Sequence, residues 1–182
     1  MMSSAPAEPS VTFWLKTIPI TPKTTPVEHH DGANPDGGLY LRHHGGGHNV
    51  VMLMPAPPKF LKGHFDEQKG RVLLTSSSHP ERQWGLVMRA SGIAGQRAGW
   101  EPVEIVQDEG DPGFIWVDRG DGEELIWKGR DGRNEDGGWR GWMCADWAYG
   151  HRQLFWVTEK YKEDVGLPTC SEMVRVVRVP TT

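Results

Sequence analysis

The chain has 182 residues, 37% of them hydrophobic and 24% charged, and its formal net charge is −4. A chain of this size fits one globular domain that buries about 70% of the surface its unfolded form exposes. The negative charge gives phosphates no basic field to follow, and no apolar run approaches the ~18 residues that cross a bilayer, so we expect neither a nucleic-acid partner nor a membrane span.

The N-terminus is small, polar and rich in proline, which predicts a disordered segment over residues 1–10 before a single β domain over residues 11–182. It has neither the basic segment nor the apolar core of a signal peptide. A cytoplasmic protein fits this pattern, and so does a secreted protein whose leader has been removed.

The rest of the chain consists of short strand-like runs between turn residues. About eleven strands without a helical period predict an all-β fold. Only residues 57–69 place apolar side chains at helical spacing, so we expect at most one short helix, in that segment. The expected strands are 12–20, 39–42, 49–54, 71–75, 84–89, 100–106, 114–117, 125–128, 139–147, 153–158 and 173–179.

Glycine- and aspartate-rich turns join these runs so closely that consecutive strands must pair antiparallel. Several runs are apolar on both faces, so the sheet must curl around a core or pack against a second sheet. The sequence therefore predicts a single antiparallel β-barrel or β-sandwich of about 10–12 short strands. The recurring tryptophans and glycines leave a β-trefoil as the alternative.

Tryptophan is the most unusual feature of the composition, because seven of the nine lie between Trp100 and Trp156. Mid-strand rings are expected in a core or lining a cavity, and rings beside turns are expected to be more exposed, where they can stack on a sugar or a flat apolar ligand. The core group is Trp116, Trp127 and Trp156. The predicted ligand-binding group is Trp139, Trp142, Trp147 and Tyr149.

No recognisable catalytic set is present, and the sequence favours a non-catalytic protein over an enzyme. The HGGG segment that begins at His44 imitates an oxyanion loop but lacks the serine elbow that such a loop serves. If the protein is an enzyme, the candidates for a general acid or base are Asp146, His151 and Glu101.

No cofactor or metal is expected, although some histidines have ligand-like spacing. His29 and Asp31 are spaced like two ligands of a two-histidine, one-carboxylate iron site, and His44 and His48 are weaker candidates for a divalent ion. We interpret these residues as loop and turn positions.

The two cysteines, Cys144 and Cys170, allow either a disulfide or two buried thiols. A bridge would close a loop of about 27 residues and stabilise the fold by roughly 3.5 kcal/mol.

Three segments resemble an uncharacterised family of fungal proteins: WEPV at 100–103, GWMCADW at 141–147 and QLFW at 153–156. That family carries W-E-P-V, G-W-x-x-C-D-W and P-Q-L-F-W segments and a late cysteine, which Cys170 matches. The likeness covers about Thr12 to Val179. Cys144 lies one residue earlier than the family's cysteine, and a one-residue shift in a strand turns a side chain to the other face.

Proteins of this family carry a domain of unknown function, often after a secretion signal. The resemblance therefore implies an evolutionary relationship but no particular reaction. We expect a fungal-type β protein that binds a carbohydrate or a small apolar molecule through its clustered tryptophans. Two alternatives stay open. One is a barrel-type cyclase or isomerase acting on a fungal metabolite, and the other is a secreted, effector-like interaction protein. The oligomeric state is not predicted.

Overall fold

The computed structural model describes residues 11–20, 38–45, 48–59, 61–88, 100–129, 139–146, 151–158 and 171–181. All regular structure in these ranges is β-strand, and they contain no helix, so the all-β prediction is confirmed. The strands are β1 Phe13–Pro19, β2 Leu39–Gly45, β3 His48–Met54, β4 Leu61–Asp66, β5 Arg71–Ser76, β6 His79–Met88, β7 Trp100–Gln107, β8 Phe114–Asp118, β9 Glu123–Trp127, β10 Trp139–Asp146, β11 Arg152–Thr158 and β12 Ser171–Pro180.

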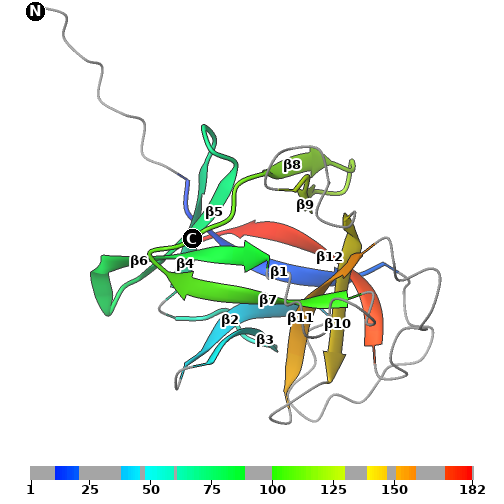
Figure 1. Ribbon diagram of the computed structural model, residues 1–182, viewed down its shortest axis with the longest axis horizontal. Coiled ribbons are helices and arrows are strands. Elements are labelled where there is room, and N and C mark those ends of the chain that lie inside the picture. The colour runs from blue at the N-terminus through cyan, green and yellow to red at the C-terminus, as the bar shows by residue number, and fades with distance from the viewer. Residues whose placement is uncertain are drawn as a thin grey trace, which may run out of the picture.

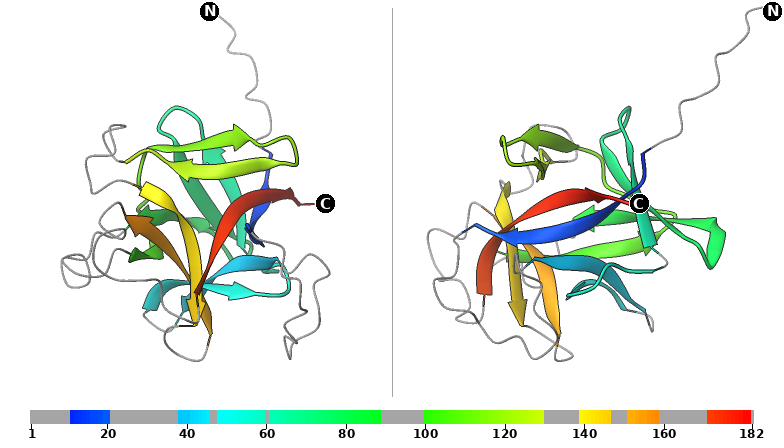
Figure 2. Two further views of the ribbon diagram at one scale, coloured as in Figure 1. Left: turned by 90° about the vertical axis from the view of Figure 1, so that its right-hand side faces the viewer. Right: turned by 180° about the vertical axis from the view of Figure 1, so that it is seen from behind.

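Antiparallel ladders close these strands into a barrel. Nine strands form the ring, in the order β1-β4-β5-β6-β7-β3-β11-β10-β12, and β12 pairs back onto β1 from Phe13↔Pro180 to Pro19↔Val174. Figure 1 and Figure 2 show the first and last strands running side by side along this closure. β2 joins β1 to β3, and the β8–β9 hairpin is attached to β12. The predicted barrel is therefore confirmed.

The pairings also repeat along the chain in three units of four strands. The second and third strands of each unit form a hairpin: β2–β3, β6–β7 and β10–β11. The fourth strand pairs with the first strand of the next unit: β4–β5, β8–β9 and β12–β1. The third strands β3, β7 and β11 pair with one another in a triangle. This is the pairing scheme of a β-trefoil, the alternative that the sequence left open.

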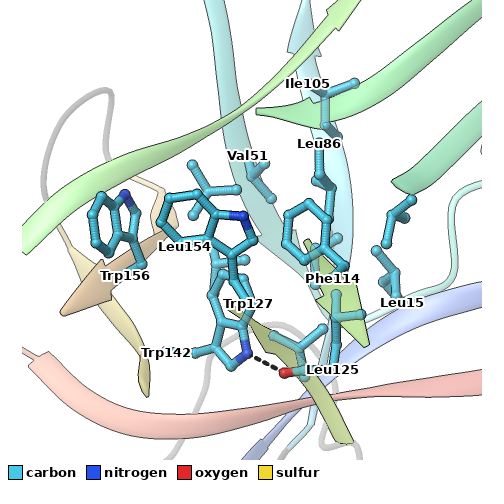
Figure 3. Packing of buried hydrophobic residues seen from close by; sticks show 14 of the residues in the cluster. Leu15, Val51, Leu86, Ile105, Phe114, Leu125, Trp127, Trp142, Leu154 and Trp156 are labelled. Atoms are coloured by element: carbon cyan, nitrogen blue, oxygen red, sulfur yellow. Dashed lines mark hydrogen bonds between the residues drawn. The ribbon is translucent and has the colours of Figure 1, made fainter. Parts of the chain in front are cut away.

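The core follows the same repeat. Alternate residues of a strand face one side, so the first and third strands of each unit place two side chains at i and i+2 inside the barrel. Figure 3 shows part of this core, in which Trp127 and Trp156 pack edge to face with ring centroids 5.1 Å apart. The inward pairs of the first strands are Phe13 and Leu15, Val72 and Leu74, and Leu125 and Trp127, and those of the third strands are Val51 and Leu53, Val103 and Ile105, and Leu154 and Trp156.

The described part of residues 57–69, where at most one short helix was expected, contains no helix, and residues 61–66 form β4. β4 pairs with β5 along its whole length, from Leu61↔Ser76 to Asp66↔Arg71. The ring of Phe13 closes over Gly63, where an added Cβ would lie 2.7 Å from Phe13 Cε2. β4 is thus held by the next strand, β5, and by the N-terminal strand β1, and helical spacing within the segment reveals neither pairing.

Candidate functional site

An open pocket of about 480 Å³ lies where the β2–β3 hairpin meets the linker to β4. This volume is in the ordinary range for small-molecule sites, ~300–1,000 Å³. The lining is mainly apolar and comes from six strands and the linker. It comprises Arg42 and His43 of β2, Met54 of β3, Pro55 to Lys59 of the linker, Leu61 of β4, Ser76 of β5, His79 and Trp84 of β6, and Ile105 of β7.

The linker at the equivalent position in the next four-strand unit shows how such a pocket can be closed. Residues 108–113, between β7 and β8, run against β6: Asp108 N donates to Gln83 O at 2.8 Å, and Asp111 N donates to Leu86 O at 2.8 Å. The Asp111 carboxylate also accepts a hydrogen bond from Met88 N at 2.7 Å. These three bonds hold the linker against β6, and the approach is so close that a Cβ added at Gly85 would lie 2.1 Å from Glu109 O.

The linker above the pocket has no such bonds. Its sequence is Pro-Ala-Pro-Pro-Lys over residues 55–59, and proline has no N–H to donate. No backbone hydrogen bond of loop type joins residues 55–59 to another described residue. We attribute the pocket to this difference, because a linker with N–H groups only at Ala56 and Lys59 has few donors with which to bind the adjacent hairpin as residues 108–113 do.

The charges at the pocket are all of one sign. Arg42 and Lys59 line it and are exposed, and no lining residue is acidic. Glu81 lies beyond the lining, with its carboxylate 3.5 Å from Nδ1 of His79. Because the chain as a whole is acidic, this mouth is a local region of positive charge.

A second hollow, of about 520 Å³, lies between the β4–β5 turn, β8 and β12. Of its aromatic residues, Trp116 is already covered on one face by the Arg178 guanidinium, 5.0 Å from the ring centroid. Arg178 also binds the carboxylate of Glu123. The lining mixes Glu67 and Glu123 with lysines and has less apolar surface than the first pocket, so this hollow is a weaker candidate.

Exposed ion pairs elsewhere are structural. Hydrogen bonds from Arg71 lower the pKa of Asp66, and hydrogen bonds from Arg175 lower that of Asp121. Each pair joins two neighbouring strands or turns, and neither carboxylate is poised to exchange a proton near neutral pH.

A family model described as a domain of unknown function, DUF7907, matches residues 10–180. The chain belongs to this family. Membership in an uncharacterised domain family, predicted from the tryptophan-containing segments, is thereby confirmed, while the fungal origin stays a prediction. No curated protein and no solved structure matches the chain. Within the described ranges, no helix is long and apolar enough to cross a membrane.

The expectation that Trp142 is exposed is wrong. Its side chain is 0% exposed, and its Nε1 donates to Leu125 O at 2.6 Å inside the barrel. Trp139 is half-buried and packs edge to face against Trp142, with centroids 5.8 Å apart. Trp147 and Tyr149 lie outside the described residues, so the ligand-stacking role of this end of the molecule stays a prediction.

The candidate acids and bases do not converge. Glu101 is 2% exposed and pairs with Trp156, whereas Asp146 is exposed and pairs with Arg152, four residues earlier on β11. Four residues along a strand correspond to about 13 Å, so the backbone positions of Glu101 and Asp146 are at least that far apart. Asp146 is held by Arg152 Nε at 3.2 Å, and the exposed His151 lies beside that pair.

The metal candidates are only partly described. His29 and Asp31 lie outside the described residues, and His44 and His48 are described only as backbone, at the β2–β3 turn. The side chains that are described include no cluster of three or more histidine, cysteine or acidic residues.

Cys144 is 1% exposed and lies in the barrel core, with its Sγ accepting a hydrogen bond from Arg152 Nη1 at 3.6 Å. Cys170 is outside the described residues, so the disulfide stays a prediction.

Sequence reasoning missed the pocket beside Trp84. The signal it offered was the proline-rich run at 55–59 directly after an apolar strand, which we read as the start of a helix. A linker with three prolines in five residues has few hydrogen bonds to offer its neighbours.

Proposed function

We propose that the protein is a non-catalytic binding protein that holds a small, largely apolar molecule in the pocket beside Trp84. One observation carries this proposal: the first unit keeps an open pocket of about 480 Å³ where the second unit is closed by its hydrogen-bonded linker. Natural ligand sites share its character, with apolar and aromatic walls and a few polar groups at the mouth.

The composition of the walls favours an apolar ligand over a carbohydrate. A sugar ring presents hydroxyls on every edge and needs a polar partner for each buried one. The apolar walls here are Met54, Leu61, Trp84 and Ile105, which together offer one polar group, the indole N–H of Trp84. A carbohydrate site depends on Trp147 and Tyr149 at the other group of aromatic residues.

Filling the pocket tests the proposal. Ala56 is exposed and lines the pocket, so Ala56→Trp puts an indole into the space without disturbing the core. The probe is N-phenylnaphthylamine, a neutral apolar dye whose emission rises in apolar sites. We expect the wild-type protein to bind it and Ala56→Trp to bind it at least about tenfold more weakly, a loss of about 1.4 kcal/mol.

The matched control is Gln68→Trp, which adds the same ring at an exposed position on the β4–β5 turn, outside the pocket. It should bind the dye as the wild type does. Absence of binding to the wild type, or equal binding to Ala56→Trp, would overturn the proposal.

A further inference from the structure

We infer that the pocket beside Trp84 selects organic anions: apolar molecules that carry one carboxylate or sulfonate group. This inference rests on the proposed function, because it names the class of ligand for the same site. It follows from which charged side chains line the pocket and from whether those side chains contact acidic residues.

The cations come from two separate elements. Arg42 is on β2, opposite Met52, and Lys59 ends the proline-rich linker, so the two contribute to the lining from different elements. Both side chains are exposed. A ligand whose apolar body rests against Trp84 and Leu61 can therefore keep its charged end at the mouth, where it stays partly hydrated. This arrangement avoids the cost of burying a charge.

Among the described residues, no carboxylate neutralises the charge of Arg42. Six arginines of the described chain contact a carboxylate: Arg71, Arg82, Arg119, Arg152, Arg175 and Arg178. Within the same described ranges, Arg42 and Lys59 contact none. In a chain with 24 acidic and 20 basic residues, two such cations at one mouth with no acidic lining residue mark a place suited to an anion.

Anion selectivity can be measured with two dyes that differ by one charged group. Anilinonaphthalene sulfonate and N-phenylnaphthylamine share the same aromatic body, and only the first carries a sulfonate. We expect the wild-type protein to bind the anionic dye about fivefold to tenfold more tightly, since each partly exposed charge pair contributes up to ~1 kcal/mol. Raising the salt concentration should reduce the affinity for the anionic dye and leave that for the neutral dye unchanged.

The charge variants locate the effect. Arg42→Gln/Lys59→Gln should lower the affinity for the anionic dye about fivefold or more and change that for the neutral dye by less than about twofold. The control, Arg140→Gln/Lys69→Gln, removes the same charge from two exposed positions that do not line this pocket. It should leave the preference for the anionic dye intact.

The outcomes separate the two proposals. If neither dye binds, or if Ala56→Trp weakens neither, the proposed function fails and the inference fails with it. If the neutral dye binds in the pocket but the anionic dye is not preferred, only the inference is overturned. The same holds if the preference survives Arg42→Gln/Lys59→Gln or disappears equally in the control.

Discussion

Two buried tryptophans in the core differ by one hydrogen bond. Trp142 and Trp156 are 0% and 1% exposed and lie opposite each other on β10 and β11. Trp142 Nε1 donates to Leu125 O of β9 at 2.6 Å, as the dashed line in Figure 3 shows. Trp156 Nε1 has no partner among the described residues. Packing is therefore similar at the two positions, and the hydrogen bond is what separates them.

Replacing each ring by phenylalanine measures that bond. Both Trp142→Phe and Trp156→Phe lose packing and leave a small cavity, and only the first also leaves the Leu125 carbonyl without its donor. We expect Trp142→Phe to cost about 1 kcal/mol more free energy of unfolding than Trp156→Phe, measured by urea denaturation. An equal or larger loss in Trp156→Phe would contradict the assignment.

His64 gives a second single-residue prediction. Burial lowers the pKa of its imidazole, with the nearby charge of Asp66 opposing the shift, and Nε2 lies 3.3 Å from Gln83 Nε2. The unfolded chain takes up this proton near pH ~6.5 and the folded chain only at lower pH, so the unfolded state binds more protons between the two values. Stability should fall as the pH drops from about 6.5 toward the folded pKa.

The measurement is the free energy of unfolding between pH 7 and 5. His64→Gln keeps a polar side chain and removes the titration, so its stability should decrease less over this window than that of the wild type. Parallel pH profiles for the two proteins would show that His64 does not contribute.

A turn can require glycine for two reasons: a positive φ, or a neighbouring backbone segment that leaves no room for a Cβ. Gly113 and Gly120 flank β8 and share a positive φ, +93° and +85°. A Cβ on Gly113 would lie 2.1 Å from Gly129 O, whereas a Cβ on Gly120 would have nothing within 4 Å. The sequence predicted both turns, and only the structure distinguishes them.

Replacing each glycine by alanine should separate the cost of a positive φ from the cost of a steric clash with neighbouring backbone. Gly120→Ala should cost about 1 kcal/mol, the ordinary penalty for a positive φ. Gly113→Ala should cost at least twice that amount, because the backbone near Gly129 must also move away. Thermal unfolding of the two variants checks the order, and similar melting temperatures would contradict it.

Local pattern predicted most strands but not β4. Alternation and turn residues located the other strands to within a few residues, since these signals are local. The segment of β4 left room for a short helix because Leu61, His64 and Phe65 have helical spacing. Its hairpin with β5 competes with that pattern, and the contact of Phe13 with Gly63 comes from a segment that a local window does not contain.

The molecule is closed by its first and last strands. β12 pairs with β1, β10 and β9, and the ends are further joined by a hydrogen bond from Thr181 N to Thr12 O at 3.2 Å. Opening this seam would expose Leu15, Val174 and Val176, all within the core. We therefore expect the barrel to unfold as one cooperative unit.

Hydrogen exchange tests this cooperativity. Hydrogen-bonded amides in the middle of the β1–β12 ladder should exchange with a free energy within about 1 kcal/mol of the global unfolding value, like those of the β6–β7 hairpin. Much faster exchange along β1 and β12 alone would show that the ring opens at this seam while the rest stays folded.

The sequence by itself determined the all-β class, most strands, the turns and the family membership, because each depends on residues close together in the chain. The tertiary structure decided the ring closure, the threefold pairing, the burial of Trp142 and the position of the pocket. These depend on which distant backbone groups meet. The pocket is the clearest case. Residues 55–59 and 108–113 each link two strands, and only the structure shows that 108–113 is hydrogen-bonded to the neighbouring hairpin. Residues 55–59 have no such bonds to described residues, and the pocket lies beneath them.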